Sequence, residues 1–504
     1  MYRSSWFLTA ALVGTSIALV QPTAAAKSAA EVEAIAKSMA VEIKLKSDQN
    51  AVGSGVIIHR QGNLYTLATN RHVVCGTSNC TKVSATELYS LSLSDGQQYR
   101  VKAANVRLLG DENDLDLAII QFRSNRNYAV AKLAAPGSLK VEDDVYTAGF
   151  PFAQPGFTFG KGQAIAVVNK RLTGDGGGYT IVYDAFTLPG MSGGGVFDAK
   201  GQLLAIHGWG DRFRENTEID NKSRFDNKIG LNRGIPARWL VQNLADVGIN
   251  LVTARSTSGI RSIRSQVPAT ADEYFIAGLN KLVEPGTDVV AGKQQAIQEF
   301  STAIRLNPRY QSAYFARAIA YSQVREFQQS LADYNQVIVI NPKYSEAYNN
   351  RAILKGTKLN DIQGALVDYN EAIVINPKDS SAYYNRAILK DTKLNDIQGA
   401  LADYNEAIVI NPKDSETYNN RAALKYTKLN DIQGALADYN EAIVTNPKNS
   451  EAYSNRAVLK YTKLKDRTGA IQDFRQAARL FREQGRTQDS QRLIDVLQLL
   501  DATE

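Results

Sequence analysis

The 504-residue sequence has very few of the side chains that bind metals or form cross-links. It has three histidines and two cysteines, Cys75 and Cys80. With ligands so scarce and only a short loop between the thiols, neither a metal site nor a cofactor is expected. The thiols flank a turn-like loop, and we predict a disulfide between them, which fits an oxidising compartment. Two buried free thiols are the alternative.

A strong charge of one sign is also missing. The chain has 58 Lys and Arg against 51 Asp and Glu, a formal net charge of +7. This excess is small and spread over many balanced charges. Nucleic acid binding is therefore not indicated.

The N-terminus has one apolar run, residues 6–20, which is too short for a comfortable membrane span. Arg3 precedes this run, and a small-residue stretch that ends at Ala26 follows it. The pattern predicts a cleavable signal peptide over residues 1–26 and an exported protein, periplasmic or extracellular, with no stable membrane span after cleavage. An uncleaved membrane anchor is the alternative.

One serine lies within a glycine-rich run, Gly190-Met191-Ser192-Gly193-Gly194-Gly195. Glycine lets the backbone turn tightly enough to aim several N–H groups at one negative charge. A nucleophilic serine needs such donors for its oxyanion, together with a neighbouring base. The run therefore predicts an acyl-transfer nucleophile at Ser192, and a flexible surface turn is the alternative.

The candidate base and its partner each lie beside a strand-like run. His72 follows the apolar run 64–69, whereas His59 ends another strand and is expected to be solvated. Asp116 directly precedes an apolar run and is the preferred carboxylate to hold the imidazole, with Asp114 second.

The order His72, Asp116, Ser192 resembles the trypsin-like serine protease superfamily in its bacterial HtrA and V8 branches. The matching segments are residues 53–58, 69–74, 116–118, 190–194 and 234–236. The resemblance implies an all-β protease domain over residues 27–252, with two β-barrels and the cleft between them. It also implies an oxyanion hole formed by the backbone N–H groups of Gly190 and Ser192. Met191 cannot pair with a new α-ammonium, so activation by a freshly cleaved N-terminus is not expected.

The segment from Ile206 to Gly210 resembles one wall of the substrate pocket in this superfamily and contains His207 and Trp209. Glutamate-specific relatives have a histidine there and a small hydroxyl residue five positions before the nucleophile, which here is Thr187. The resemblance implies a preference for Glu before the scissile bond. A histidine satisfied inside the barrel core is the alternative.

The C-terminal half repeats itself. The dipeptide Asn-Pro begins at residues 307, 341, 376, 411 and 446. This period of 34 or 35 residues predicts a helical array and is similar to tetratricopeptide repeats. We expect six repeats over residues 271–480, an all-α solenoid, and a capping helix over residues 481–504. The resemblance implies that the concave face binds peptides or partner proteins, and a structural spacer is the alternative.

A linker rich in Ser, Thr and Arg, residues 253–270, is expected to be flexible, so that protease and array move independently. No function is assigned to residues 211–228, a predicted polar loop. The whole pattern predicts an exported serine endopeptidase that cleaves protein or peptide substrates, with the array for recognition. The alternative is a catalytically silent scaffold or chaperone-like protein-binding protein.

Overall fold

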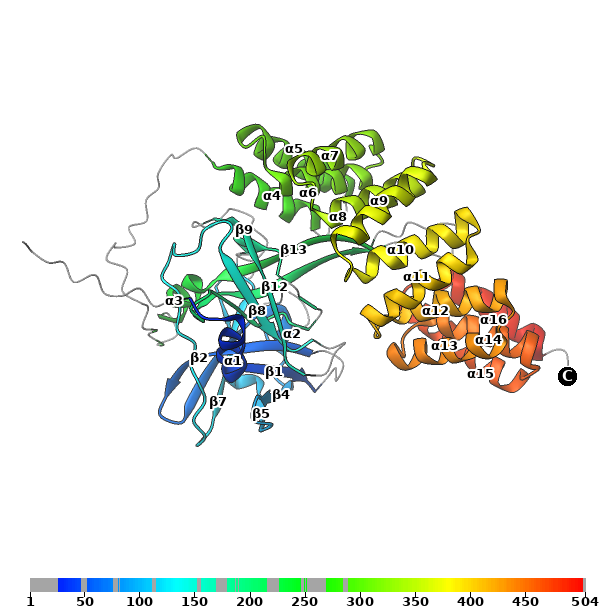
Figure 1. Ribbon diagram of the computed structural model, residues 1–504. Helices are drawn as coiled ribbons and strands as arrows, with labels where there is room; N and C mark the ends of the chain where they lie inside the picture. Colours follow the sequence, from blue (N-terminus) through cyan, green and yellow to red (C-terminus); the bar gives the residue numbers. More distant parts are fainter. Residues whose placement is uncertain are drawn as a thin grey trace, which may run out of the picture.

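The computed structural model has a β-sheet part followed by a helical part (Figure 1). It describes residues 26–46, 52–75, 80, 82–110, 115–151, 156–168, 179–185, 187–188, 190–214, 226–245, 249, 251, 269–283 and 289–501. Nearly all of the predicted signal peptide and linker, together with Asp114, lie outside these residues. The predicted fold class, a β-barrel protease domain followed by a helical solenoid, is confirmed. None of the described helices is both long and apolar enough to cross a bilayer.

The first sheet is antiparallel, with strand order β5-β4-β1-β2-β3-β7-β6. Its strands are β1 (Ala40–Leu45), β2 (Val52–Gln61), β3 (Leu64–Thr69), β4 (Leu88–Leu93), β5 (Gln98–Lys102), β6 (Val106–Leu109) and β7 (Leu117–Arg123). Helix α1 (Ala29–Met39) precedes them, α2 (Arg71–Cys75) follows β3, and a short 3-10 turn, η1 (Ala103–Asn105), separates β5 from β6. In β4 the buried residues alternate, as expected for a strand with one face on the core.

The second sheet closes into a barrel in the order β10-β13-β12-β11-β8-β9. Its strands are β8 (Asp144–Gly149), β9 (Thr158–Val167), β10 (Ile181–Tyr183), β11 (Gly195–Phe197), β12 (Leu203–Arg214) and β13 (Asp226–Pro236), and helix α3 (Ala237–Ala245) follows. The predicted loop over residues 211–228 is wrong at both ends, because residues 211–214 and 226–228 extend the paired strands β12 and β13. Pairing between β12 and β13 extends the strands there, although the polar composition favours a loop.

The helical part consists of helix pairs. The helices are α4 (Ala271–Val283), α5 (Val289–Leu306), α6 (Gln311–Gln323), α7 (Phe327–Ile340), α8 (Ser345–Thr357), α9 (Ile362–Ile375), α10 (Ser380–Leu389), α11 (Ile397–Ile410), α12 (Ser415–Leu424), α13 (Ile432–Thr445), α14 (Ser450–Leu459), α15 (Arg467–Glu483) and α16 (Thr487–Asp501). The turns η2 (Lys390–Leu394), η3 (Lys425–Leu429) and η4 (Lys460–Leu464) extend α10, α12 and α14.

The second helices α9, α11, α13 and α15 begin with the same local signals. Asp396, for example, caps α11 by accepting a hydrogen bond from the Gly399 N–H, and Asn395 just before it adopts a left-handed conformation with φ of 51°. Alanines such as Ala387 and Ala400 are fully buried where neighbouring helices touch. The sequence period therefore corresponds to one helix pair.

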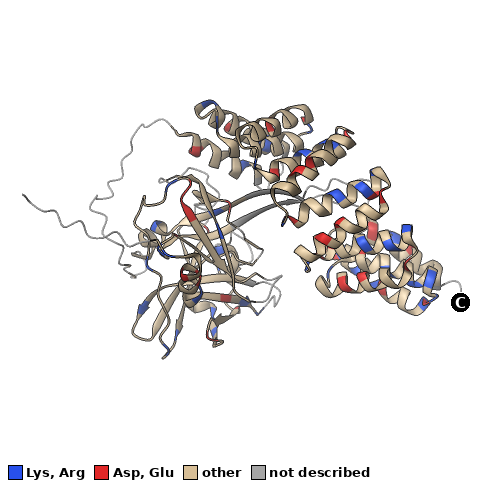
Figure 2. Cartoon of the chain, viewed as in Figure 1, with Lys and Arg blue, Asp and Glu red and all other residues tan. Residues whose placement is uncertain are grey.

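An ion-pair ladder runs through the array. Arg386 donates to Asp403 through Nε and Nη2, at 2.8 and 2.7 Å, and Lys390 lies 2.9 Å from the same carboxylate. The equivalent pairs are Arg317 with Asp333, Arg351 with Asp368, Arg421 with Asp438 and Arg456 with Asp473. Both signs of charge are accordingly mixed along these helices (Figure 2).

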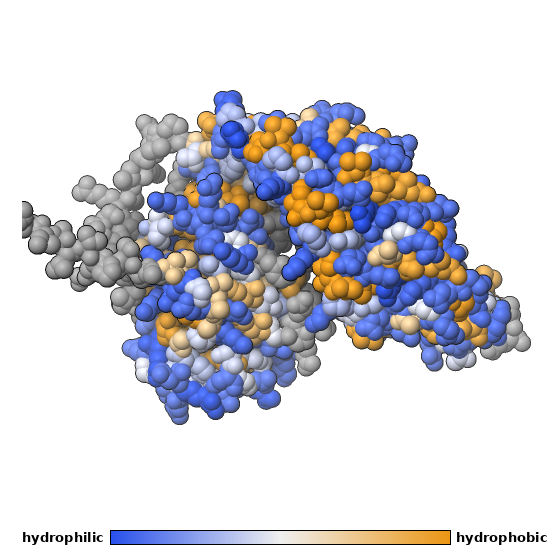
Figure 3. Space-filling view, viewed as in Figure 1, coloured by the Kyte–Doolittle hydropathy of each residue, from blue (hydrophilic) through white to orange (hydrophobic). Residues whose placement is uncertain are grey.

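The N-terminal end of the array packs against the second barrel (Figure 1). One apolar cluster contains Val168, Val182 and Leu231 of the barrel together with Phe275 and Ile276 of α4. The expectation that the two parts move independently is therefore wrong for the first helices, which share a buried core with the barrel. Hydrophobic side chains also gather on the face of the helical part that Figure 3 shows.

Candidate active site

His72 and Asp116 lie in direct contact. His72 is on α2, directly after β3, and Asp116 directly precedes β7, the strand that pairs with β3. The imidazole Nδ1 is 2.6 Å from Asp116 Oδ2, and the His72 backbone N–H donates to Oδ1 at 2.9 Å. The carboxylate is 1% exposed. A buried carboxylate that holds both the backbone and the ring of one histidine fixes the orientation of that ring.

Tyr179 is a third partner of this carboxylate, and the sequence analysis missed it. Its hydroxyl donates to Asp116 Oδ2 at 2.5 Å. Burial, followed by the charge of Asp116, raises the pKa of Tyr179 well above its usual value, so the hydroxyl keeps its proton and remains a donor. Gly208 leaves room for it, because a Cβ at Gly208 would lie 2.0 Å from the tyrosine oxygen.

Ser192 lies beside this cluster, in the turn before β11. Its Oγ donates to the Gly208 carbonyl at 3.1 Å, and its own carbonyl accepts a hydrogen bond from the Ser54 N–H at 2.7 Å. Among the described residues, the hydroxyl makes its hydrogen bond to Gly208 rather than to His72. Ser192 thus bonds to Gly208, the residue that packs on Tyr179. Tyr179 in turn bonds to Asp116, the partner of His72.

The glycine-rich turn is closed by backbone hydrogen bonds that leave two amides out. Met191 N–H donates to Leu188 at 3.1 Å, and Gly193 N–H donates to His207 at 2.7 Å. Within the part of the chain that the structure describes, the N–H groups of Gly190 and Ser192 have no hydrogen-bond acceptor. Gly190 has φ of 98°, a left-handed conformation that favours glycine. The N–H groups of Gly190 and Ser192, on either side of Met191, can therefore donate hydrogen bonds to an oxyanion.

Ser54 of β2 connects the two sheets at this turn, a role that its sequence motif did not reveal. Its Oγ donates to the Gly190 carbonyl at 3.0 Å and accepts from the Phe150 N–H at 2.7 Å. Its carbonyl accepts the Thr69 hydroxyl at 2.7 Å. The turn that carries Ser192 is therefore fixed from the first sheet as well as from its own barrel.

Of the three predicted pocket residues, Thr187 and His207 are described with their side chains. Thr187 Oγ1 donates to Asn232 Oδ1 at 2.5 Å. His207 is 2% exposed, and its Nδ1 is 2.6 Å from the Tyr183 hydroxyl. Burial, followed by the nearby His72, lowers the pKa of His207 to about 3, so its ring is neutral at ordinary pH. The Trp209 side chain lies outside the described residues, and its backbone pairs with β13.

The predicted disulfide between Cys75 and Cys80 is present, with the two Cα atoms 6.2 Å apart. Cys75 is the last residue of α2, the helix that carries His72. The bridge therefore ties the end of this helix to the chain that follows it.

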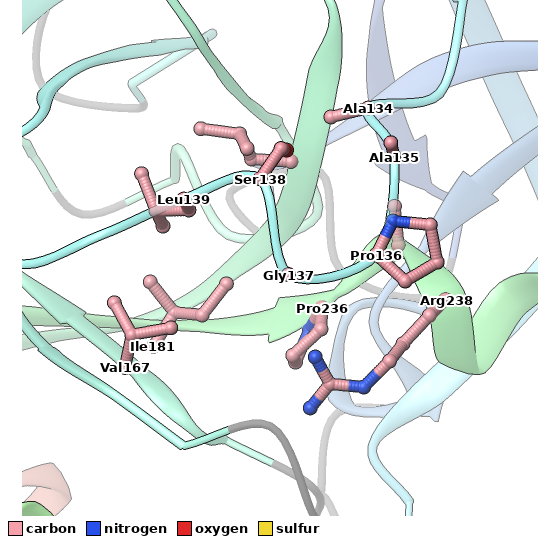
Figure 4. Close-up of a pocket in the computed structure, with 12 residues that line it drawn as sticks. Ala134, Ala135, Pro136, Gly137, Ser138, Leu139, Val167, Ile181, Pro236 and Arg238 are labelled. Atoms are coloured by element: carbon pink, nitrogen blue, oxygen red, sulfur yellow. The ribbon is translucent and has the colours of Figure 1, made fainter. Parts of the chain in front are cut away.

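A separate cavity of about 30 Å³ lies beside the second barrel (Figure 4). Pro136, Leu139, Ile181 and Arg238 are among its lining residues, and His72, Asp116 and Ser192 are not. Its volume suits one or two water molecules, so it is not the site where a peptide would bind.

Part of the chain is similar to known proteins. Residues 53–206 match the model of a trypsin-like peptidase domain. The chain is 31% identical over 162 residues to a probable serine protease do-like of Buchnera aphidicola, which covers 32% of this chain and 30% of the relative. It is also 31% identical over 157 residues to the periplasmic serine endoprotease DegP of Escherichia coli K12, covering 31% and 30%.

Among solved structures, an HtrA-type protease, AlgW, with a tripeptide matches with a TM-score of 0.33 and 22% identity, over 44% of this chain and 63% of that chain. The chain spans about 30% of the length of the curated relatives named above. Residues 53–206 therefore match a trypsin-like peptidase domain, and the relatives of this region include HtrA and DegP serine proteases.

Proposed function

We propose that this chain is an exported serine endopeptidase in which Ser192 is the nucleophile, His72 the general base and Asp116 the group that orients it. The observation that carries the proposal is the contact of the buried Asp116 with His72, together with a serine on a tight glycine turn that bonds to Gly208, the residue against Tyr179. Export is supported by the apolar N-terminal run and by the periplasmic DegP relative.

The reaction follows from these groups. The Ser192 hydroxyl turns from the Gly208 carbonyl toward His72, attacks the peptide carbonyl carbon and gives its proton to His72 Nε2. The N–H groups of Gly190 and Ser192 hold the oxyanion. His72 then protonates the leaving amine as the C–N bond breaks, and water, deprotonated by His72, hydrolyses the acyl-enzyme. Asp116 stays ionised and stabilises the imidazolium.

For specificity we propose a preference for Glu before the scissile bond. With the Tyr183 hydroxyl donating to His207 Nδ1, the ring proton lies on Nε2, and a neutral imidazole can donate it to a substrate carboxylate. The hydroxyl of Thr187, which donates to Asn232 in this structure, would turn to the substrate carboxylate as the second donor. Peptides that differ only in Glu or Gln at this position test the preference, which is wrong if both are cleaved equally fast.

The helical part is proposed to be an array of tetratricopeptide repeats over residues 271–480, closed by a cap over residues 481–504. The 35-residue helix pairs and their equivalent Arg–Asp pairs support this assignment. Its concave face would recruit protein substrates or partners. A protein substrate should then be cleaved more slowly when an excess of the isolated array competes for it.

A fluorophosphonate probe tests the catalytic proposal directly. The full chain should be labelled at Ser192, as peptide mapping would show, whereas Ser192→Ala should not react and His72→Ala should react at least a hundredfold more slowly. Thermal denaturation of each variant checks its folding. A folded wild-type chain that stays unlabelled across pH 5 to 9 would support the silent scaffold instead.

A further inference from the structure

We propose that the first helix of the array supplies a positioning residue to the active site, Asn280, which acts on Asp116 through Arg233 and Tyr179. The inference rests on the proposed protease function and adds to it. It assigns the array a role inside the protease domain, independent of any substrate that the array binds.

The chain of contacts begins at the interface between α4 and the second barrel. Arg233 Nη1 donates to Asn280 Oδ1 at 2.5 Å. The arginine is 2% exposed and the asparagine 4% exposed. A buried guanidinium needs a fixed acceptor, and here the array provides one from outside the protease domain.

The next contact is between Arg233 and Tyr179. The guanidinium carbon lies 6.0 Å from the centre of the tyrosine ring, within the range of a cation–π interaction. The tyrosine hydroxyl in turn donates to Asp116. Because Tyr179 is 1% exposed and Gly208 leaves just enough room for its hydroxyl, a shift of the ring would be transmitted to the carboxylate.

Arg233 is also part of the wall behind the predicted pocket. On β13 it pairs with Val182 of β10 and with Trp209 of β12. Its carbonyl lies 3.4 Å from the Tyr183 hydroxyl, the partner of His207. Arg233, which bonds to Asn280 of the array, therefore contacts two tyrosines of the site. These are Tyr179, the partner of Asp116, and Tyr183, the partner of His207.

Apolar packing keeps this connection in place. Val168, Val182 and Leu231 of the barrel are at most 3% exposed and belong to the same cluster as Phe275 and Leu279 of α4. Removing the array would expose this face and take the Asn280 acceptor away from Arg233. A protease domain that ends at residue 252 should thus turn over even short peptides poorly.

The test is Asn280→Leu in the full chain, assayed with a short chromogenic peptide. The variant should lower kcat about five- to tenfold and change KM less than twofold, since the lost hydrogen bond acts on the catalytic carboxylate. Asn280→Asp keeps an acceptor oxygen at the same place and should restore most of kcat. A matched control is Asn385→Leu, which removes an equally buried asparagine that bonds to Asn349 deep in the array.

A second readout does not depend on activity. The chain has only three histidines, so NMR of histidine-labelled full chain resolves the His72 ring. Its resonances should move in Asn280→Leu and stay in place in Asn385→Leu. Unmoved His72 resonances, unchanged kcat in a folded Asn280→Leu, or an equal loss in the control would each overturn the inference. If the His72 resonances move in Asn280→Leu but the wild-type chain never labels with fluorophosphonate, the protease function alone would be overturned.

Discussion

Replacing Tyr179 by phenylalanine isolates one hydrogen bond of the proposed active site. The change removes the hydroxyl that donates to Asp116 Oδ2 at 2.5 Å and keeps the ring that packs against Arg233. A hydrogen bond to a charged group contributes about 1.5 to 3 kcal/mol. Asp116 keeps the two bonds from His72, so the loss should lie near the lower value.

A loss of about 1.5 kcal/mol that is felt mainly in the transition state lowers kcat roughly tenfold. KM should hardly change, because Tyr179 is 1% exposed and does not line an open surface. The assay is steady-state cleavage of a chromogenic peptide, with thermal denaturation to show that the variant folds.

The matched variant is Tyr183→Phe, which removes a buried hydroxyl that bonds to His207 instead of Asp116. It should reduce discrimination between Glu and Gln peptides more than it reduces the rate of labelling by a fluorophosphonate. The reasoning is refuted if a folded Tyr179→Phe retains wild-type kcat, or if both variants lose labelling equally.

Two further predictions concern stability. Because the pKa of His207 falls to about 3 in the folded protein, the unfolded chain binds more protons between pH 6.5 and 3, and stability should drop as the pH falls. From pH 6.5 to 5 this amounts to about 1.5 kcal/mol, and denaturant titrations of His207→Gln should show a flatter pH dependence than wild type. Reduction of the Cys75–Cys80 bridge should cost about 2 kcal/mol and lower the Tm, whereas a Cys75→Ser, Cys80→Ser chain should not respond to reductant.

The sequence alone identified the fold class and predicted the residues that the structure brings together. The motifs around His72, Asp116 and Ser192 are local, because each needs a particular strand end or glycine turn that neighbouring residues encode. The 35-residue period likewise reflects contacts within a helix pair and between adjacent pairs. The disulfide followed from a separation of five residues across one loop.

The supports of the site came only from the tertiary structure. Tyr179 reaches Asp116 across 63 residues, and Asn280 reaches Arg233 across 47. The sequence pattern around Tyr179 or Asn280 does not predict the residue that each contacts. A strand or helix pattern predicts which face is buried, but not which element covers that face. Packing of α4 on the second barrel decided the Asn280–Arg233 contact, and packing between the two sheets decided the Tyr179–Asp116 contact, since burial forced each polar group to find its acceptor within reach.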